Sequence, residues 1–205
     1  ITPQLNAALT INTDFSATEV DDRQVNLSRF SLFFPEKRDF FLQDSDIFSF
    51  GDLRRNGMPF HSRRIGLGSD GQPADLEVGT KLTGRVGRFN IGVLGVQQDG
   101  FDDVNNSNLF VGRVAANILR ESSIGLIMTD GDPRSNLDNS LAGFDFRYRN
   151  TGITETHSLE GGFWYQASDT PGIDAEQDAW GVSLSTPNNN EGFEGDIAFQ
   201  KIEEN

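Results

Sequence analysis

Hydrophobic and polar residues alternate along much of this chain, as they do in a β-strand with one apolar and one polar face. The alternation is clearest at residues 141–149, where Phe144, Phe146 and Tyr148 occupy one face and charged residues occupy the other. The pattern predicts a regular antiparallel meander over residues 76–205. Its expected strands are 76–86, 89–97, 108–119, 123–129, 141–149, 157–167, 178–186 and 192–202, preceded by a strand at 5–12.

The lengths of strands and connections indicate the class of sheet. Strands in soluble proteins average about five or six residues, whereas tilted membrane-spanning strands need about nine to eleven, as most of these strands have. Short turns such as 87–88 alternate with long polar loops such as 130–140, which is typical of outer-membrane barrels. We therefore predict an all-β, antiparallel up-and-down meander that forms all or part of a transmembrane barrel. A soluble β-sandwich or soluble barrel explains the alternating faces as well.

Residues 13–75 interrupt the meander and are expected to form a folded insertion that acts as a plug, lid or anchor within a single domain of residues 1–205. The aromatic residues of 26–51 follow neither a period of two nor one of 3.6, which favours a compact folded loop, and 60–65 could add a short strand. A salt-bridged turn at 36–38 is favoured over a catalytic group. The residues expected to build the plug are Phe30, Phe33, Phe34, Glu36, Lys37, Arg38, Phe40 and Phe41.

The composition of the chain excludes several classes of partner and structure. The formal net charge is -14, which argues against nucleic acid as a partner, because such binding depends on basic surface. The chain contains no cysteine, so disulfides and thiolate metal sites are excluded. No apolar run is long enough for a transmembrane helix, while the mean hydropathy of -0.44 is compatible with a barrel that hides its apolar residues in alternation. The termini, Ile1 and Asn205, suggest a piece of a longer protein.

One part of the chain resembles a known family. The run NTDFSATEVDDRQVNLSRFSLFFPEKRDFFLQDSDIFSFG at 12–51, with SRRIGL at 62–67 and GTKLTGRVGRFNIGVL at 79–94, carries the resemblance. These residues resemble the large C-terminal β-barrel domain, of unassigned function, of bacterial outer-membrane proteins that begin with a family 9 carbohydrate-binding-like module. The resemblance implies an outer-membrane location and a barrel of which this chain is the first part. It implies no catalytic residues.

Charged residues on the polar faces of the strands are candidates for the barrel lumen. Rows of mixed sign either line a water-filled pore or neutralise one another across neighbouring strands, and the second reading is favoured. The lumen-facing candidates are Lys81, Arg85, Asp145, Arg147, Arg149 and Glu160. Arg63 and Arg64 are candidates for binding an anionic sugar or a lipid phosphate, with pairing to the preceding acidic run as the alternative.

Acidic segments suggest a cation site. Asp14, Glu19, Asp21 and Asp22 are crowded beside the aromatic insertion and could provide oxygen ligands to a divalent cation such as calcium. Solvated surface acids are the alternative interpretation. No other cofactor is expected.

The functional hypothesis is passage or capture of a solute at the outer membrane, with membrane lipid as a partner. A saccharide is suggested as the solute by the resemblance alone. One alternative is a membrane-bound hydrolase, although His61 and His157 are the only histidines and no Gly-x-Ser-x-Gly motif is present. The other alternative is a soluble β-protein that binds a ligand through its acidic loops.

Overall fold

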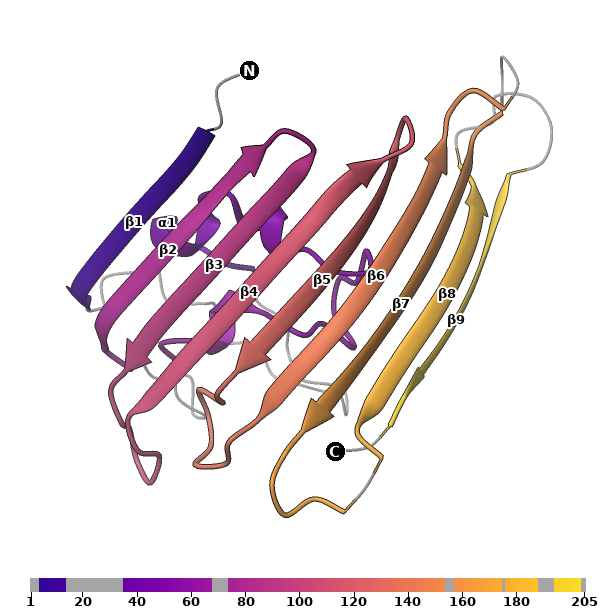
Figure 1. Cartoon of the computed structure of the whole chain (residues 1–205). Coiled ribbons are helices and arrows are strands. Elements are labelled where there is room, and N and C mark those ends of the chain that lie inside the picture. The colour runs from indigo at the N-terminus through magenta and orange to yellow at the C-terminus, as the bar shows by residue number, and fades with distance from the viewer. Residues whose placement is uncertain are drawn as a thin grey trace.

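A computed structural model describes residues 4–13, 35–67, 74–153, 157–174, 176–187 and 194–203. The strands among these residues form one antiparallel sheet, in which each strand pairs with its neighbours in the sequence (Figure 1). The predicted all-β antiparallel meander is therefore confirmed. Its nine strands are β1 (Gln4–Thr13), β2 (Leu76–Val86), β3 (Phe89–Gln98), β4 (Ser107–Ile118), β5 (Ser122–Asp130), β6 (Ser140–Asn150), β7 (Leu159–Asp169), β8 (Asp178–Thr186) and β9 (Gly195–Ile202).

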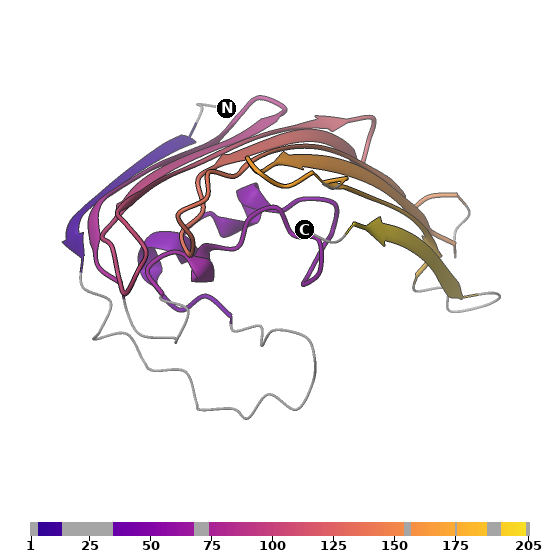
Figure 2. The same ribbon diagram turned by 90° about the horizontal axis from the view of Figure 1, so that it is seen from below.

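The sheet curves into an arch and does not close (Figure 2). β1 pairs only with β2, and β9 pairs only with β8, so the two edge strands lie at opposite ends of the arch. The described strands therefore form a curved, open sheet and not a closed barrel. No helix among the described residues is long and apolar enough to cross a bilayer.

The predicted alternation of short and long connections holds in the first part of the sheet. Residues 87–88 and 119–121 make tight turns, and Gly87 adopts the positive φ of 60° that its two-residue turn requires. The connections at the opposite end, 99–106 and 131–139, are longer. The connections after β6 and β8 are as long as these, because β7 begins at Leu159 and β9 only at Gly195. The predicted asymmetry therefore fails in the second part of the sheet.

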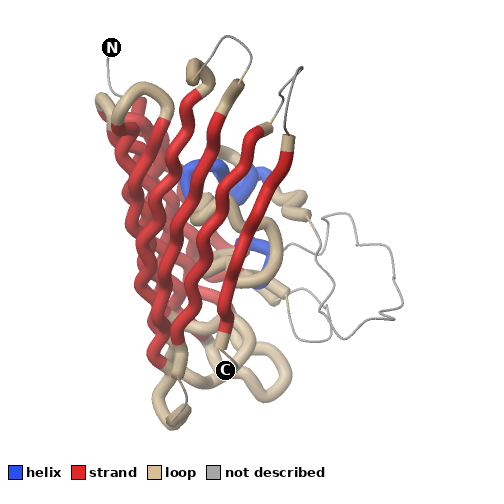
Figure 3. The backbone as a smooth tube through the Cα atoms, turned by 90° about the vertical axis from the view of Figure 1, so that its right-hand side faces the viewer, coloured by secondary structure: helices blue, strands red, loops and turns tan. Residues whose placement is uncertain are grey.

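The segment 35–67 lies against the concave face of the arch (Figures 2 and 3). It contains a short helix, α1 (Asp39–Leu42), and two single-turn 3-10 helices, η1 (Ser45–Phe48) and η2 (Ser62–Arg64). The short strand expected at 60–65 is therefore wrong. Three of its residues form η2 instead, whose turn closes with a hydrogen bond from Ile65 N to Ser62 O (2.9 Å).

Aromatic side chains of this segment form a core with the concave face. Phe41, Phe48 and Phe50 are buried against strand residues that include Leu94, Val111, Ile127 and Trp164. Glycines on the strands make this close approach possible. A Cβ at Gly92 would lie 2.9 Å from the rings and methyls of Ile47 and Phe48, and one at Gly143 would lie 2.8 Å from the ring of Phe50.

The convex face is apolar and exposed. Its cross-strand register places Leu82 beside Val93, Ile124 beside Phe146, and Val182 beside Phe199. Large apolar side chains on this face stay exposed, and Leu9 and Leu126 retain 64% and 59% of their accessible surface. On β6 the face is continued by Phe144, whose ring centroid lies 6.3 Å from that of Phe163 on β7. The apolar residues of the convex face are therefore uncovered, whereas those of the concave face pack against segment 35–67.

Regular alternation of faces fails at the start of β2. Strict alternation would put Leu76 and Val78 on one face, but a register shift between them turns Leu76 to the concave side, where it is fully buried. Val78 remains on the convex face. The irregularity inserts one residue into the ladder, which is the effect of a β-bulge.

Candidate functional site

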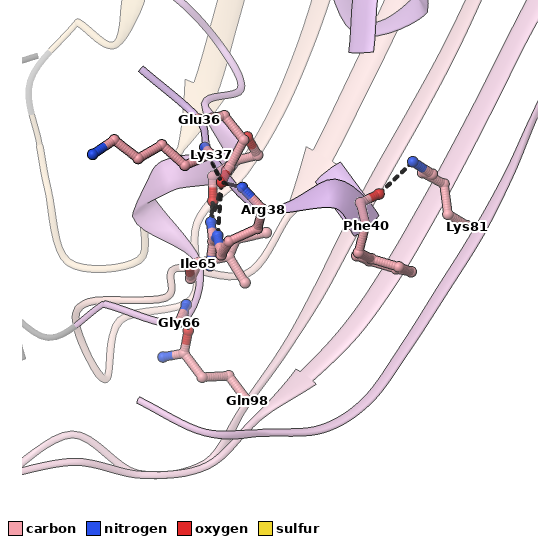
Figure 4. Close-up of polar contacts among 9 residues, drawn as sticks. Glu36, Lys37, Arg38, Phe40, Ile65, Gly66, Lys81 and Gln98 are labelled. Carbon is pink, nitrogen blue, oxygen red and sulfur yellow. Dashed lines mark hydrogen bonds and ion pairs between the residues drawn. The ribbon is translucent and has the colours of Figure 1, made fainter. Parts of the chain in front are cut away.

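The polar contacts between segment 35–67 and the concave face form the candidate site. Arg38 is the centre of the first group, because its guanidinium is almost fully buried. It donates to Ile65 O (2.6 Å) and Ser62 O (2.8 Å), and its Nε lies 2.7 Å from Glu36 Oε1 (Figure 4). The same guanidinium stacks over the ring of Phe41, with Cζ 4.3 Å from the centroid. Arg38 thus joins the two ends of the described insertion.

Glu36 completes this group. One oxygen accepts from the backbone N–H groups of Lys37 and Arg38 (3.0 Å each), and the other accepts from Ser62 Oγ (2.7 Å). Burial raises the pKa of the Glu36 carboxyl, but hydrogen bonds and charge attraction from Arg38, together with the bond from Ser62, outweigh burial and lower the pKa to about 2. The arrangement is a closed, fully partnered ion pair, which is the salt-bridged turn expected at 36–38. The Lys37 side chain points away from it (Figure 4).

Lys81 fastens α1 to β2. Its buried amine donates to the backbone oxygens of Phe40 and Gln43, the latter at 2.7 Å (Figure 4). These carbonyl groups are available because α1 is short and its last carbonyls have no hydrogen-bond partner inside the helix. The structure thus places Lys81 on the concave face, where it binds the insertion.

A second group of contacts follows α1 along β1 and β2. Asp44 accepts from Asn6 Nδ2 (2.8 Å) and Thr83 Oγ1 (2.7 Å), and these two hydrogen bonds lower the pKa of Asp44. Arg85 donates to Asp46 Oδ2 at 2.6 Å on the exposed rim. The loop between α1 and η1 is therefore held by two strands at once.

A second buried ion pair joins strands that are not neighbours. Arg113 on β4 donates to both oxygens of Asp145 on β6, at 2.6 and 3.0 Å, and Arg113 keeps only 4% of its surface exposed. Asp145 also accepts from Gly51 N at 3.2 Å. The ring of Phe50 lies over the guanidinium, 5.6 Å from Cζ. This pair thus ties the insertion to the middle of the sheet.

The remaining lumen candidates form an exposed network at the end of the sheet with the tight turns. Arg149 Nε lies 3.0 Å from Glu160 Oε1 on the neighbouring strand, and Arg147 lies between Asp52 (3.3 Å) and Glu160 (3.7 Å). Ion pairs of this exposure contribute little individually to stability. Together they balance the charges of a mixed-sign row on the concave face.

Gln98 is an anchor that sequence reasoning missed. It is fully buried, accepts from Gly66 N (2.7 Å) through Oε1 and donates to Pro133 O (2.8 Å) through Nε2 (Figure 4). It therefore links the insertion to the β5–β6 loop. A glutamine at the end of a strand is common on solvated surfaces, so the sequence contained no signal of this role.

The anion-site candidates do not lie together on one surface. Arg63 is the buried residue of η2, whereas Arg64 is exposed with its guanidinium 3.8 Å from Asp132. His61 lies on the insertion, and His157 lies in the β6–β7 connection at the end of the sheet with the tight turns, so the structure does not combine the two histidines. The candidates Phe30, Phe33, Phe34, Asp14, Glu19, Asp21 and Asp22 lie outside the described residues.

A cavity of about 470 Å³ lies between the insertion and the ends of β4–β9. Its lining includes Phe60 and His61 of the insertion, Asp132 of the β5–β6 loop, and Gln166 and Asp178 of the sheet. Near the β7–β8 loop, the carboxylates of Glu176, Asp178 and Glu203 have oxygens within 4.8 Å of one another, and Lys201 forms an ion pair with Glu203. The volume falls within the range of about 300–1,000 Å³ that is typical of small-molecule sites.

Comparison with known families adds one finding. Residues 4–89 match a family described as a domain of unknown function, DUF5916. The match spans β1, the insertion, β2 and the start of β3, so the expected similarity to a domain of unassigned function is confirmed for this part of the chain. No curated protein and no solved structure is significantly similar to the chain.

Proposed function

We propose that the sheet is part of the wall of a bacterial outer-membrane barrel, that segment 35–67 is its plug, and that the protein captures or passes a solute. The observation that carries this proposal is the exposed apolar convex face opposite a concave face that carries Lys81, Arg113 and Asp145 among its apolar residues and is covered by segment 35–67. Barrels that span membranes carry apolar residues outward and polar residues inward. Lipid is the partner that such a face requires.

Strand length supports the same proposal. The strands contain 8 to 12 residues, and a tilted strand needs about nine to eleven to cross the hydrocarbon layer. A soluble sandwich would need a second sheet over the convex face, because large exposed apolar patches are rare on soluble monomers. In a bilayer the free edges of β1 and β9 need partners, so this proposal requires further strands to close the wall.

The position of the insertion favours capture at the cell exterior. It leaves the sheet between β1 and β2 at the same end as the loops 99–106, 131–139 and 170–177. The opposite end contains the tight turns 87–88 and 119–121, and outer-membrane barrels place their short turns in the periplasm and their longer loops outside the cell. A solute from the cell exterior would therefore reach the plug and the cavity beside it before it reached the lumen.

Extraction and conductance test the proposal. The full-length protein should fractionate with outer membranes, require detergent to stay monodisperse, and give channel events in planar bilayers when residues 14–75 are replaced by an Asn-Gly turn. The unmodified protein, with its plug, should give smaller events. A folded, monodisperse protein in detergent-free buffer would show that the membrane assignment is wrong.

A further inference from the structure

Apolar side chains of the insertion and of the sheet meet in the cavity of about 470 Å³. On the sheet, Val111 and Leu141 lie in one concave row of cross-strand partners, which Thr129 joins. From the insertion, Met58 and Phe60 line the same space. The cavity therefore has apolar walls from two parts of the chain that lie far apart in the sequence.

The apolar walls of the cavity stay partly exposed. Phe60 and Leu141 pack against the core but are only partly buried. Leu137 and Ile202, which also line the cavity, keep 52% and 43% of their surface exposed. Removal of apolar surface from water is favourable, so a solute with an apolar body would gain free energy by covering these side chains.

The ionised groups of the lining are not directed at a charged solute. Arg64 pairs with Asp132 at 3.8 Å, and Glu203 pairs with Lys201. The strand register turns the two remaining acidic residues of the lining to the convex face, and these are Asp130 and Asp178. Among the described residues, each carboxylate and guanidinium of the lining is thus either paired or turned away. An ion that entered the cavity would lose water without gaining a counter-charge, which favours an uncharged solute.

Polar side chains at the loop end of the lining bond to other protein groups. Asn139 Nδ2 donates to Thr170 Oγ1 at 2.7 Å, and Ser168 Oγ donates to Gln177 O at 3.3 Å. The amide of Gln177 in turn donates to Ile173 O at 3.2 Å. A solute with many hydroxyl groups would have to break these bonds or bury hydroxyls without partners, and either is costly. The lining therefore disfavours a saccharide.

The size of the cavity sets the size of the solute. An apolar cavity of about 150 Å³ can hold one benzene ring. The volume of about 470 Å³ therefore leaves room for two fused rings or an aliphatic body of similar size.

We propose that this cavity binds an uncharged solute with an apolar body of about two fused rings, held between the insertion and the concave row of Val111, Thr129 and Leu141. The inference names the solute class of the capture function and rests on that function for the claim that the site faces the cell exterior. Binding itself requires only the folded protein.

The test compares three probes that share one ring system and differ in charge. Naphthylmethanol, naphthoate and naphthylmethylamine are equilibrated by dialysis against the full-length protein in lipid nanodiscs, and uptake by protein-free nanodiscs is subtracted. Naphthylmethanol is expected to bind at least about tenfold more tightly than either ion, because the cavity offers no counter-charge, and glucose is expected not to bind. An affinity for either ion equal to or above that for naphthylmethanol, or no binding of naphthylmethanol above the background, would overturn the proposal.

Variants assign the binding to the cavity. Thr129→Phe adds a ring to the concave row that lines the cavity and should weaken the binding of naphthylmethanol at least about tenfold. The matched control, Met128→Phe, adds the same ring at the neighbouring position on the convex face and should leave the affinity unchanged. Ile173→Ser removes part of the apolar wall without filling the space and should weaken the binding about fivefold. Unchanged affinity in both Thr129→Phe and Ile173→Ser would contradict the proposed site.

The two proposals can fail separately. Selective binding of naphthylmethanol by a protein that stays folded and monodisperse without detergent would contradict the membrane assignment and leave the cavity assignment intact. Channel events in bilayers together with equal binding of the three naphthyl probes would have the opposite meaning.

Discussion

Arg113 and Asp145 form a bidentate ion pair across an intervening strand. They belong to β4 and β6, and the guanidinium lies over Gly125 of β5, where a Cβ would come within 2.5 Å of its Nη1. The glycine thus provides the space through which two non-neighbouring strands are joined. Because Asp145 also binds Gly51 N, the pair connects sheet and insertion.

Removal of one partner of this pair should be costly. Arg113→Ala leaves a buried carboxylate without its guanidinium and should lower the free energy of unfolding by about 3–5 kcal/mol. The double variant Arg113→Met, Asp145→Leu should lose much less, because no charge then stays buried. Urea unfolding in detergent measures both. Arg120→Ala, in the exposed turn 119–121, is the matched control and should change the free energy by less than about 0.5 kcal/mol.

The Glu36 group should confer a pH dependence. Its folded-state pKa of about 2 lies below the ordinary 4.5, so the carboxylate stabilises the fold above pH 4.5 and this contribution is lost as the pH falls from 4.5 to 2. Glu36→Gln should therefore be less stable than the unmodified protein at neutral pH, by about 2 kcal/mol after allowance for solvent screening.

Unfolding curves across this pH range check the expectation. The stability difference between the two proteins should shrink toward pH 2. A difference that stays constant with pH would mean that Glu36 acts by packing rather than by charge.

Lys81→Met should loosen α1 without opening the sheet. The variant keeps the length of the side chain but removes the donor for the carbonyl oxygens of Phe40 and Gln43. Amide hydrogen exchange should accelerate about tenfold or more across 39–43, because loss of a charged hydrogen bond costs about 1.5–3 kcal/mol of local stability. Thr80→Val, on the opposite face of β2, is the control. Faster exchange throughout β2 in Lys81→Met would contradict a purely local role.

Gly143→Ala should displace the insertion. An added Cβ would lie 2.8 Å from the ring of Phe50, so the aromatic core must shift, at a cost of about 1–3 kcal/mol. Gly161→Ala adds the same atom where its nearest contact is an ordinary 3.6 Å. Near-ultraviolet circular dichroism should change in the first variant and not in the second. Identical spectra and stabilities for both would show that Phe50 is not packed against β6.

Leu126→Lys tests the environment of the convex face. Leu126 is 59% exposed at the middle of β5, so in water a lysine there should be harmless or favourable. In a bilayer the same change should cost about 2–4 kcal/mol and reduce the yield of folded protein in vesicles. Leu119→Lys, in the tight turn after β4, should have little effect in either setting. Efficient insertion of Leu126→Lys would argue against contact with lipid.

The strands were predictable because hydrophobic and polar residues alternate in them, from 76–86 to 192–202. This alternation reflects the face on which each side chain lies, and it can be read from each strand separately. The pairing of Arg113 with Asp145 was not predictable, because it depends on the register of three strands at once. The turn of Leu76 to the concave face arises from a single-residue irregularity that leaves no mark on composition. The folds of α1 and η1 were also beyond reach, because their aromatics follow the shape of the concave face rather than a helical period.

Thr13 and Leu76 are cross-strand partners, so β1 and β2 form an ordinary hairpin whose turn has been replaced by residues 14–75. Every strand of the sheet therefore folds against its neighbour in the sequence, and no strand pairing depends on the inserted segment. The insertion thus replaces the turn of one hairpin and is separate from the strand pairing of the sheet. Its removal or exchange would change what fills the arch without altering the order in which the arch is built.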